Sequence, residues 1–293
     1  TPPRRWLGCP ARTTGTPSHS RRAAEWRHAI QPRKVGIVNT ESDPRPFPSD
    51  RDHIEVVGGA EKGASHPVFA LKMDCKEPRL VGERMPLTQA CLADIGANAI
   101  KIGMLGSART ALALAKRLDS FSGAIVFDPV MVASSGAELA DAATIAGFAT
   151  LMDIATLVTP NLPELGALTG MPLGSVDEIG EAAAVLAARH DTSVLAKGGH
   201  GDGARVADIL VAPSGEAMVF DDARLPGEHT HGTGCTLSSA IATLLGHGQA
   251  LPHAVRLARG FVRAAIENAP GFGEGSGPLG HQAVRSLAYR SSS

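Results

Sequence analysis

From Leu87 onward, apolar residues recur at two alternating spacings, that of buried strands and that of helices. Unbroken apolar runs predict strands, and a repeat of three to four residues predicts helices. The expected strands lie at 98–105, 123–132, the start of 156–164, 193–199, 207–212 and 217–222. The expected helices lie at 87–96, 107–120, 177–190, after Gly234 and at 253–269. Ser107 is the expected N-cap of the second helix.

This alternation predicts an α/β fold, because strands buried on both faces carry nearly continuous apolar runs. We expect a mostly parallel central sheet with helices on both faces. Ligands bind outside the carboxyl ends of the strands in such sheets. The polar residues that follow the strands are Asp128, Asn161, Glu164, Lys197 and the glycine turn 232–234.

The glycine turn opens a predicted helix, whose free backbone N–H groups and partial positive charge attract anions. Gly232 and Gly234 let the backbone approach a phosphate closely, and Thr230 and Thr233 add hydroxyl donors. An ordinary glycine-rich cap is the alternative. The sequence has no GxxxxGK[ST] motif, which excludes a P-loop.

Cys235 lies in the first turn of that helix, where the helix dipole favours a thiolate. The alternative role is that of a small buried apolar residue. His229 and His231 lie close by in sequence, but H-x-H-x3-C lacks a further ligand for a metal site.

The bulk composition excludes several classes of function. A net charge of −1 gives no sign of a nucleic-acid partner, and the absence of an 18-residue apolar run argues against a membrane span. Four cysteines without CxxC spacing fit a reducing compartment, so we expect a cytoplasmic protein.

The chain divides into an atypical N-terminal segment, 1–86, and a compact domain, 87–293. The first segment is basic and holds more than half of the prolines. Its acid-poor start is similar to an organelle transit peptide, but the arginines have no accompanying apolar face, which favours a disordered or divergent extension.

Six blocks in a fixed order resemble one enzyme family. They are NAIKIGML, FDPVMVASSG, VTPNLPELGALTG, LAKGGH, THGTGC and GSGPLGHQ, within residues 87–281. The combination is similar to the hydroxymethylpyrimidine and phosphomethylpyrimidine kinases of thiamine biosynthesis, which belong to the ribokinase-like superfamily. The resemblance implies a three-layer ribokinase-like fold, ATP with Mg²⁺ as cofactors, and a small pyrimidine as the acceptor.

The resemblance also implies roles for the phosphate-binding residues. Cys235 matches the family position of the base that takes the acceptor proton. The amides of Gly232, Thr233 and Gly234 would stabilise the moving phosphoryl group. Lys197 would bind the ATP phosphates, with Thr230 beside the nucleotide; the alternative for Lys197 is a solvated strand-end lysine. Gly198, Gly199 and His200 would shape the adjoining turn.

Further matches concern the metal and the acceptor. Asp128 and Glu164 would hold Mg²⁺, with Asn161 organising the cofactor; the alternative for Asn161 and Glu164 is a helix-capping pair. Met104 and Val130 match residues that line the pyrimidine pocket, and each could equally be core.

The front of the chain departs from the family pattern. The glycine-rich stretch that binds the pyrimidine and closes over it is missing, and 53–59 and 66–73 are candidate substitute strands. The nucleotide half of the site therefore has stronger support than the acceptor half. A pyridoxal kinase of the same branch and a catalytically impaired nucleotide-binding remnant stay open as alternatives. The superfamily commonly forms homodimers, but no sequence patch identifies an interface.

Overall fold

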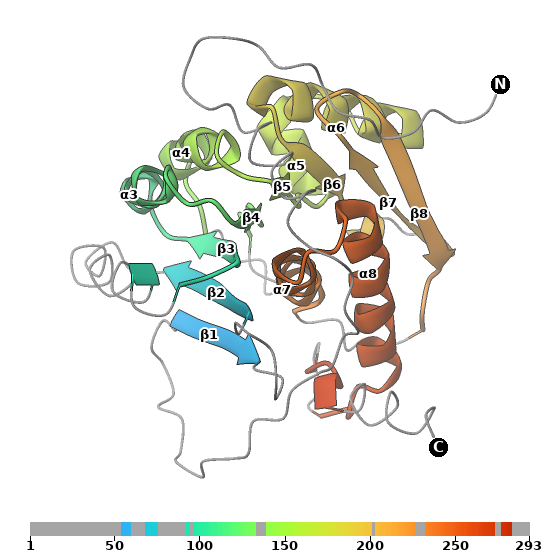
Figure 1. The fold of residues 1–293 in the computed structure, drawn as a ribbon. Coiled ribbons are helices and arrows are strands. Elements are labelled where there is room, and N and C mark those ends of the chain that lie inside the picture. The colour runs from blue at the N-terminus through green and yellow to red at the C-terminus, as the bar shows by residue number, and fades with distance from the viewer. Residues whose placement is uncertain are drawn as a thin grey trace, which may run out of the picture.

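The computed structural model of the chain describes most of the region after residue 95 and two strands before it. The described residues are 54–59, 68–75, 92–93, 96–132, 139–200, 203–226, 232–272 and 277–282. Their strands form one eight-stranded sheet in chain order, from β1 to β8 (Figure 1). The strands are β1 Ile54–Gly59, β2 Val68–Cys75, β3 Ala99–Leu105, β4 Ala124–Phe127, β5 Leu157–Val158, β6 Ser193–Ala196, β7 Arg205–Val211 and β8 Ala217–Ala223.

The centre of the sheet is parallel, as the sequence predicts. Strands β2 to β6 pair in parallel, whereas β1, β7 and β8 pair antiparallel with their neighbours. The carboxyl ends of β3, β4, β5 and β6 therefore meet at one edge of the sheet. The polar residues that follow these strands are brought together there.

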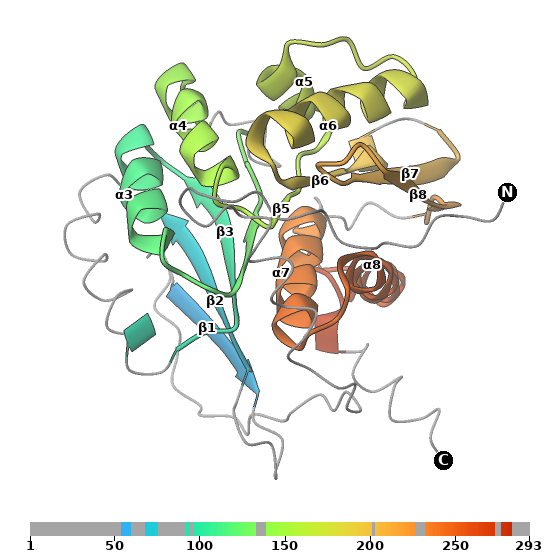
Figure 2. The same cartoon turned by 45° about the horizontal axis from the view of Figure 1, so that its top comes forward.

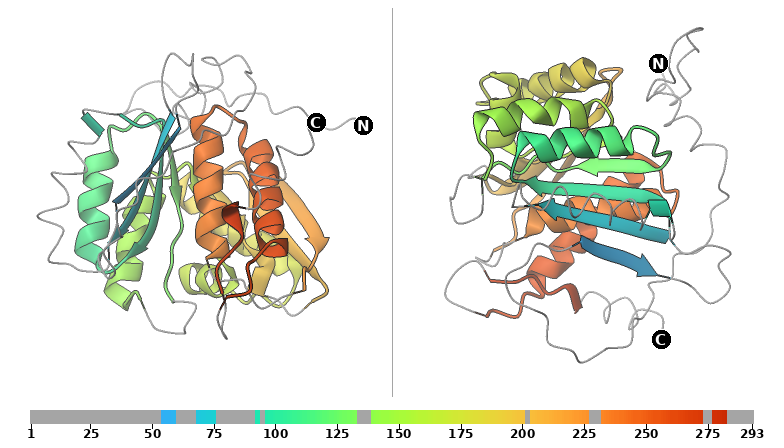
Figure 3. Two further views of the ribbon diagram at one scale, coloured as in Figure 1. Left: turned by 90° about the horizontal axis from the view of Figure 1, so that it is seen from below. Right: turned by 90° about the vertical axis from the view of Figure 1, so that its left-hand side faces the viewer.

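Helices cover both faces of the sheet and make three layers. They are α3 Ala108–Leu118, α4 Ala142–Met152, α5 Leu162–Thr169, α6 Val176–His190, α7 Thr233–Gly246 and α8 Leu251–Glu267, with a short 3₁₀ turn η2 at Gly198–His200. Helices α3 to α6 lie on one face, and α7 and α8 on the other (Figures 2 and 3). Helix α7 follows the edge strand β8 in the chain but packs against β2, β3 and β4 near the other side of the sheet.

The central strands are buried on both faces, which explains their continuous apolar sequences. In β4, Ile125 and Phe127 belong to the core under α3 to α6. Ala124 and Val126 belong to the core under α7 and α8. Alternate residues of a strand point to opposite faces, so a strand between two helix layers has no polar side.

Helix boundaries follow local capping chemistry. Ser107 caps α3 by accepting a hydrogen bond from the Thr110 N–H, which confirms its predicted role. Helix α4 was not predicted. Its sequence, AATIAGFATLM, is apolar on most sides and lacks the polar stripe that marks an amphipathic helix.

The segment before residue 87 contributes two strands to the sheet. Strands β1 and β2 occupy nearly the ranges 53–59 and 66–73 that the sequence indicates. The division of the chain at residue 86 stays a prediction, and the expected helix at 87–96 lies mostly outside the described residues. No helix in the described part of the chain is long and apolar enough to cross a lipid bilayer.

The packing of α3 gives a test of the fold. Leu114 is fully buried under the sheet, whereas Leu112 on the same helix is 52 % exposed. Because Leu114→Ala leaves a cavity, we expect it to lower the free energy of unfolding by about 2–5 kcal/mol in denaturant titrations. Leu112→Ala is the matched control and should cost less than about 1 kcal/mol. Equal losses would contradict this placement of α3.

Candidate functional site

The site is built at the carboxyl edge of the sheet by residues that directly follow β4, β5 and β6. Asp128 follows β4, and Lys197 follows β6. Between them, Asn161 forms a parallel bridge with Lys197, whose backbone N–H donates to the Pro160 carbonyl over 2.8 Å. This backbone pairing extends the sheet by one residue and so fixes the backbone position from which the Lys197 side chain starts.

Asp128 is the centre of the site and is 1 % exposed. Its Oδ1 accepts hydrogen bonds from Lys197 Nζ over 2.7 Å and from the Thr159 hydroxyl over 3.1 Å. The Ser238 hydroxyl of α7 donates to its Oδ2 over 3.2 Å. A second ammonium, Lys101 Nζ of β3, lies 3.9 Å from the same Oδ2. Four parts of the chain therefore converge on one carboxylate.

The lysine charges determine the ionisation of this cluster. Burial alone would raise the pKa of the Asp128 carboxyl, but the nearby Lys197 and Lys101 charges lower it below its usual value. Burial would likewise lower the pKa of Lys197, but Asp128 and Glu164 raise it above normal. The pair is therefore a true ion pair, carboxylate with ammonium.

Glu164 is the second carboxyl of the site, and its pKa is raised, whereas that of Asp128 is lowered. It forms a reciprocal capping box at the start of α5: the Glu164 N–H donates to Asn161 Oδ1 over 2.8 Å, and the Asn161 N–H donates to Glu164 Oε2 over 2.7 Å. Burial raises the pKa of Glu164 to about 7, and the charge of Asp128 adds to this rise against the effect of Lys197. The capping role foreseen for this pair is thus present.

The start of α7 faces this charge cluster. Gly232 is the N-cap with φ of 83°, a left-handed conformation that glycine adopts at no steric cost. Because glycine has no side-chain acceptor, it leaves the first-turn N–H groups to other partners. A β-carbon at Gly234 would stand 3.2 Å from Lys197 Nζ, so the ammonium lies directly against the turn. Cys235 is half-buried, and it is among the groups that raise the pKa of Lys197, after the larger contributions of Asp128 and Glu164.

The structure brings together most of the residues that the sequence singled out. Asp128, Glu164, Lys197, Gly234 and Cys235 meet between the strand ends and α7. Met104, the second-last residue of β3, and Val130, two residues after Asp128, are half-buried at the same edge of the sheet. Thr230 and the side chain of His200 lie outside the described residues.

Sequence reasoning missed three groups of this cluster. Thr159, Ser238 and Lys101 contact Asp128, but only their placement in the fold reveals it. Of these three residues, only Lys101 could have been noticed in the sequence, because it is the single charged residue in the apolar run of β3.

A further network supports the turn that follows Lys197. The Gly198 N–H donates to the Asp208 carboxylate of β7 over 2.8 Å. Asp208 is itself paired with the buried Arg259 of α8, whose guanidinium also donates to Asp222 over 2.7 Å. Helix α8 is thereby connected, through Asp208 of β7, to the turn that follows Lys197.

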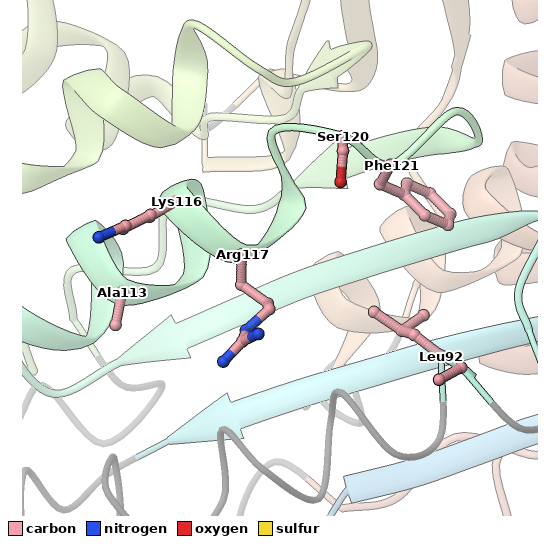
Figure 4. A pocket seen from close by; sticks show the side chains of 7 residues that line it. Leu92, Ala113, Lys116, Arg117, Ser120 and Phe121 are labelled. Carbon is pink, nitrogen blue, oxygen red and sulfur yellow. The ribbon is translucent and has the colours of Figure 1, made fainter.

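A large hollow of about 690 Å³ lies elsewhere, beside the C-terminal half of α3 (Figure 4). Arg117 and Phe121 are among its lining residues. It contains none of the predicted site residues. Helix α3 covers the face of the sheet opposite to α7, so this hollow is not part of the charged cluster.

The carboxylates suit the magnesium ion that the family resemblance implies. Mg²⁺ prefers oxygen ligands and usually keeps several waters while binding one or two carboxylates. Asp128 and Glu164 provide two carboxyl groups close enough for the charge of one to raise the pKa of the other. Asp128 is held ionised. The donor set therefore fits a hydrated magnesium ion.

Comparison with known proteins agrees with this geometry. A family model described as phosphomethylpyrimidine kinase matches residues 78–280, more than half of the chain. The multifunctional thiamine biosynthesis protein ThiED of Corynebacterium glutamicum is 37 % identical over 197 residues, which cover 66 % of this chain and 26 % of that protein. The hydroxymethylpyrimidine/phosphomethylpyrimidine kinase of Streptomyces coelicolor is 40 % identical over 189 residues, 64 % of this chain and 70 % of that protein.

A solved structure extends the comparison to the fold. An ADP complex of Bacillus subtilis pyridoxal kinase superposes with a TM-score of 0.63 at 28 % identity, covering 72 % of this chain and 84 % of that chain. The predicted three-layer ribokinase-like fold is thus confirmed. More particularly, the chain belongs to the phosphomethylpyrimidine kinase family. It spans only about a quarter of the length of the ThiED relative.

The raised pKa of Glu164 predicts a pH dependence of stability. A carboxyl with a pKa near 7 in the folded protein and 4.5 in the unfolded chain binds its proton more tightly when folded. Its contribution is fully present below about pH 4.5 and is lost as the pH rises through 7.

Glu164→Gln should remove this dependence and still accept the capping hydrogen bond. Between pH 4.5 and 7, we expect the metal-free wild type to lose about 2–3 kcal/mol of unfolding free energy relative to the variant. Urea titrations across this range provide the measurement. If the unfolding free energies of the two proteins changed with pH in the same way, the pKa of Glu164 would not be raised and this prediction would be wrong.

The turn after Lys197 gives a second prediction. A β-carbon at Gly198 would overlap the carbonyl oxygen of Ala207, whereas one at Gly199 would meet nothing within 4 Å. Gly198→Ala must therefore shift the turn, and overpacking of this kind costs about 1–3 kcal/mol in stability. Gly199→Ala is the matched control. Thermal unfolding of both variants decides the point, and a Gly198→Ala protein as stable as the control would disprove the close approach.

Proposed function

We propose that this protein transfers the terminal phosphoryl group of ATP to 4-amino-5-hydroxymethyl-2-methylpyrimidine and to its monophosphate, as a step in thiamine biosynthesis. The observation that carries the proposal is the Asp128–Lys197 ion pair placed against the N-terminus of α7. Phosphoryl transfer depends mainly on positioning and charge stabilisation. A lysine, a helix N-terminus and two carboxyl groups in one place supply these.

On the nucleotide side, Lys197 binds the ATP phosphates beside the backbone N–H groups of Gly232, Thr233 and Gly234. Asn161 and Thr230 complete the nucleotide site in this proposal. Support comes from the 3.2 Å between Lys197 Nζ and a β-carbon position at Gly234. The Bacillus subtilis pyridoxal kinase of similar fold was solved with ADP.

Asp128 and Glu164 hold Mg²⁺ in the same proposal. When bound, the ion neutralises charge on the phosphates. The chain's own part is to keep Asp128 ionised through its lysine partners, as its lowered pKa indicates. The rise in the pKa of Glu164 means that metal binding at this carboxyl competes with a proton near neutral pH.

On the acceptor side, Cys235 takes the proton of the attacking hydroxymethyl group. A thiol in the first helical turn and near an ammonium favours the thiolate form, and Cys235 has both neighbours. Met104 and Val130 line the pyrimidine pocket in this proposal. A cytoplasmic location and a homodimeric state are the accompanying expectations.

Pyridoxal is the second candidate acceptor, because the similar Bacillus subtilis structure is a pyridoxal kinase. Pyridoxal also presents a hydroxymethyl group on an aromatic nitrogen ring. The specificity is set by the ratio of kcat/KM for the two acceptors. We expect the pyrimidine to be preferred, in keeping with the family match over residues 78–280.

A coupled ADP-release assay with each acceptor tests the assignment. Wild-type turnover should require ATP, Mg²⁺ and the pyrimidine. Loss of a general base lowers kcat by about 10²–10⁴ fold, so Cys235→Ala should show a loss of this size with little change in the KM for ATP. Cys91→Ala, which removes a thiol upstream of the site strands, is the control.

Three results would overturn parts of the proposal. Equal kcat for wild type and Cys235→Ala removes the thiol from the reaction. A higher kcat/KM for pyridoxal assigns the protein to the other branch. Binding of nucleotide without turnover of either acceptor indicates the impaired remnant, because the glycine-rich acceptor stretch is missing from the sequence.

A further inference from the structure

Lys101 is a buried cation that the nucleotide site described above does not use. It lies in β3 between Ile100 and Ile102 and is 1 % exposed. Its ammonium has no hydrogen-bond partner in the part of the chain that the structure describes. Burying an ammonium is costly unless a partner compensates it, and the compensating charge is Asp128 Oδ2 at 3.9 Å.

The two lysines around Asp128 differ in what they can reach. Lys197 hydrogen-bonds to Oδ1, has a side chain 13 % exposed and lies against the turn at Gly234. Lys101 approaches the other oxygen from within the sheet and is enclosed. Lys197 can therefore turn toward an anion at the start of α7, whereas Lys101 stays beside the carboxylate.

We propose that Lys101 is a positioning residue for phosphate binding, which remains as the counter-ion of Asp128 when Lys197 transfers its hydrogen bond to a nucleotide phosphate. The proposal rests on the proposed nucleotide site. It adds a residue that touches neither nucleotide nor acceptor.

The need for a second cation follows from the burial of Asp128. A buried carboxylate that loses its only ion-pair partner is strongly destabilised. The Thr159 and Ser238 hydroxyls give Asp128 neutral hydrogen bonds but no opposite charge. With Lys101 in place, the departure of Lys197 leaves one ammonium beside the carboxylate. Without Lys101, and with no metal ion bound, Asp128 would hold Lys197 back from the phosphate.

Binding of metal-free ADP, measured by calorimetry in EDTA, tests this directly. Lys101→Met and Lys101→Gln remove the charge while keeping a similar chain length. Loss of one buried positive charge should weaken ADP binding by at least about tenfold in each variant. Thr159→Val is the matched control, since it removes a neutral hydrogen bond from the same carboxylate, and its effect should be smaller.

A double-mutant cycle with Asp128→Asn shows whether Lys101 acts through the carboxylate. In that background we expect Lys101→Met to change ADP affinity by less than about threefold, because the anion that it compensates is absent. An equal loss in both backgrounds would overturn the proposal, as would wild-type ADP affinity in the two Lys101 variants. If both variants fail to fold, Lys101 is a structural group and the proposal is also wrong.

Failure of the inference on Lys101 can be distinguished from failure of the proposed function. A wild-type protein that binds ADP but phosphorylates neither acceptor contradicts only the acceptor assignment, and the Lys101 cycle can still be measured. A wild-type protein that binds no ADP removes the nucleotide site and this inference with it.

Discussion

The ion pair between Asp128 and Lys197 is the constraint on which the rest of the site depends. A carboxylate that is almost fully buried must have its charge compensated, and two lysines do so, while two hydroxyls from other elements add neutral hydrogen bonds. Each of these groups is held by a different part of the fold: β3, β6, the end of β5 and α7. The charged cluster therefore forms only when the sheet and the helix layer that contains α7 are packed together.

The two carboxyl groups of the site illustrate how environment divides similar side chains. Asp128 has two ammonium groups beside it, so its pKa falls. Glu164 is committed to capping α5, and burial raises its pKa to about 7. One group is thus a permanent anion, whereas the other changes its charge near neutral pH. Pairs of titratable groups whose environments push their pKa values apart are typical of catalytic sites.

Much of this arrangement could be predicted from the sequence, because parallel strands place their carboxyl ends together. Asp128 and Lys197 follow apolar runs that are recognisable as strands, and Ser107 is recognisable as a helix N-cap. Helix α4 could not be recognised in the sequence, because apolar residues lie on most of its sides and leave no helical repeat of apolar and polar positions. The contact between Ser238 and Asp128 spans 110 residues, and no local pattern encodes such a distance. The roles of Cys235, Met104 and Val130 stay predictions.

The path of α7 has a consequence for the order of assembly. The edge strands β7 and β8 precede α7 in the chain, which then returns to pack against β2, β3 and β4 and brings Ser238 and the glycine turn to Asp128. Contacts between distant segments form slowly, since a long loop must close first. During synthesis, the buried carboxylate and its lysines therefore exist before their final cover. In the proposed nucleotide site, phosphate binding would therefore require that the C-terminal fifth of the chain, from α7 onward, has already packed against the sheet.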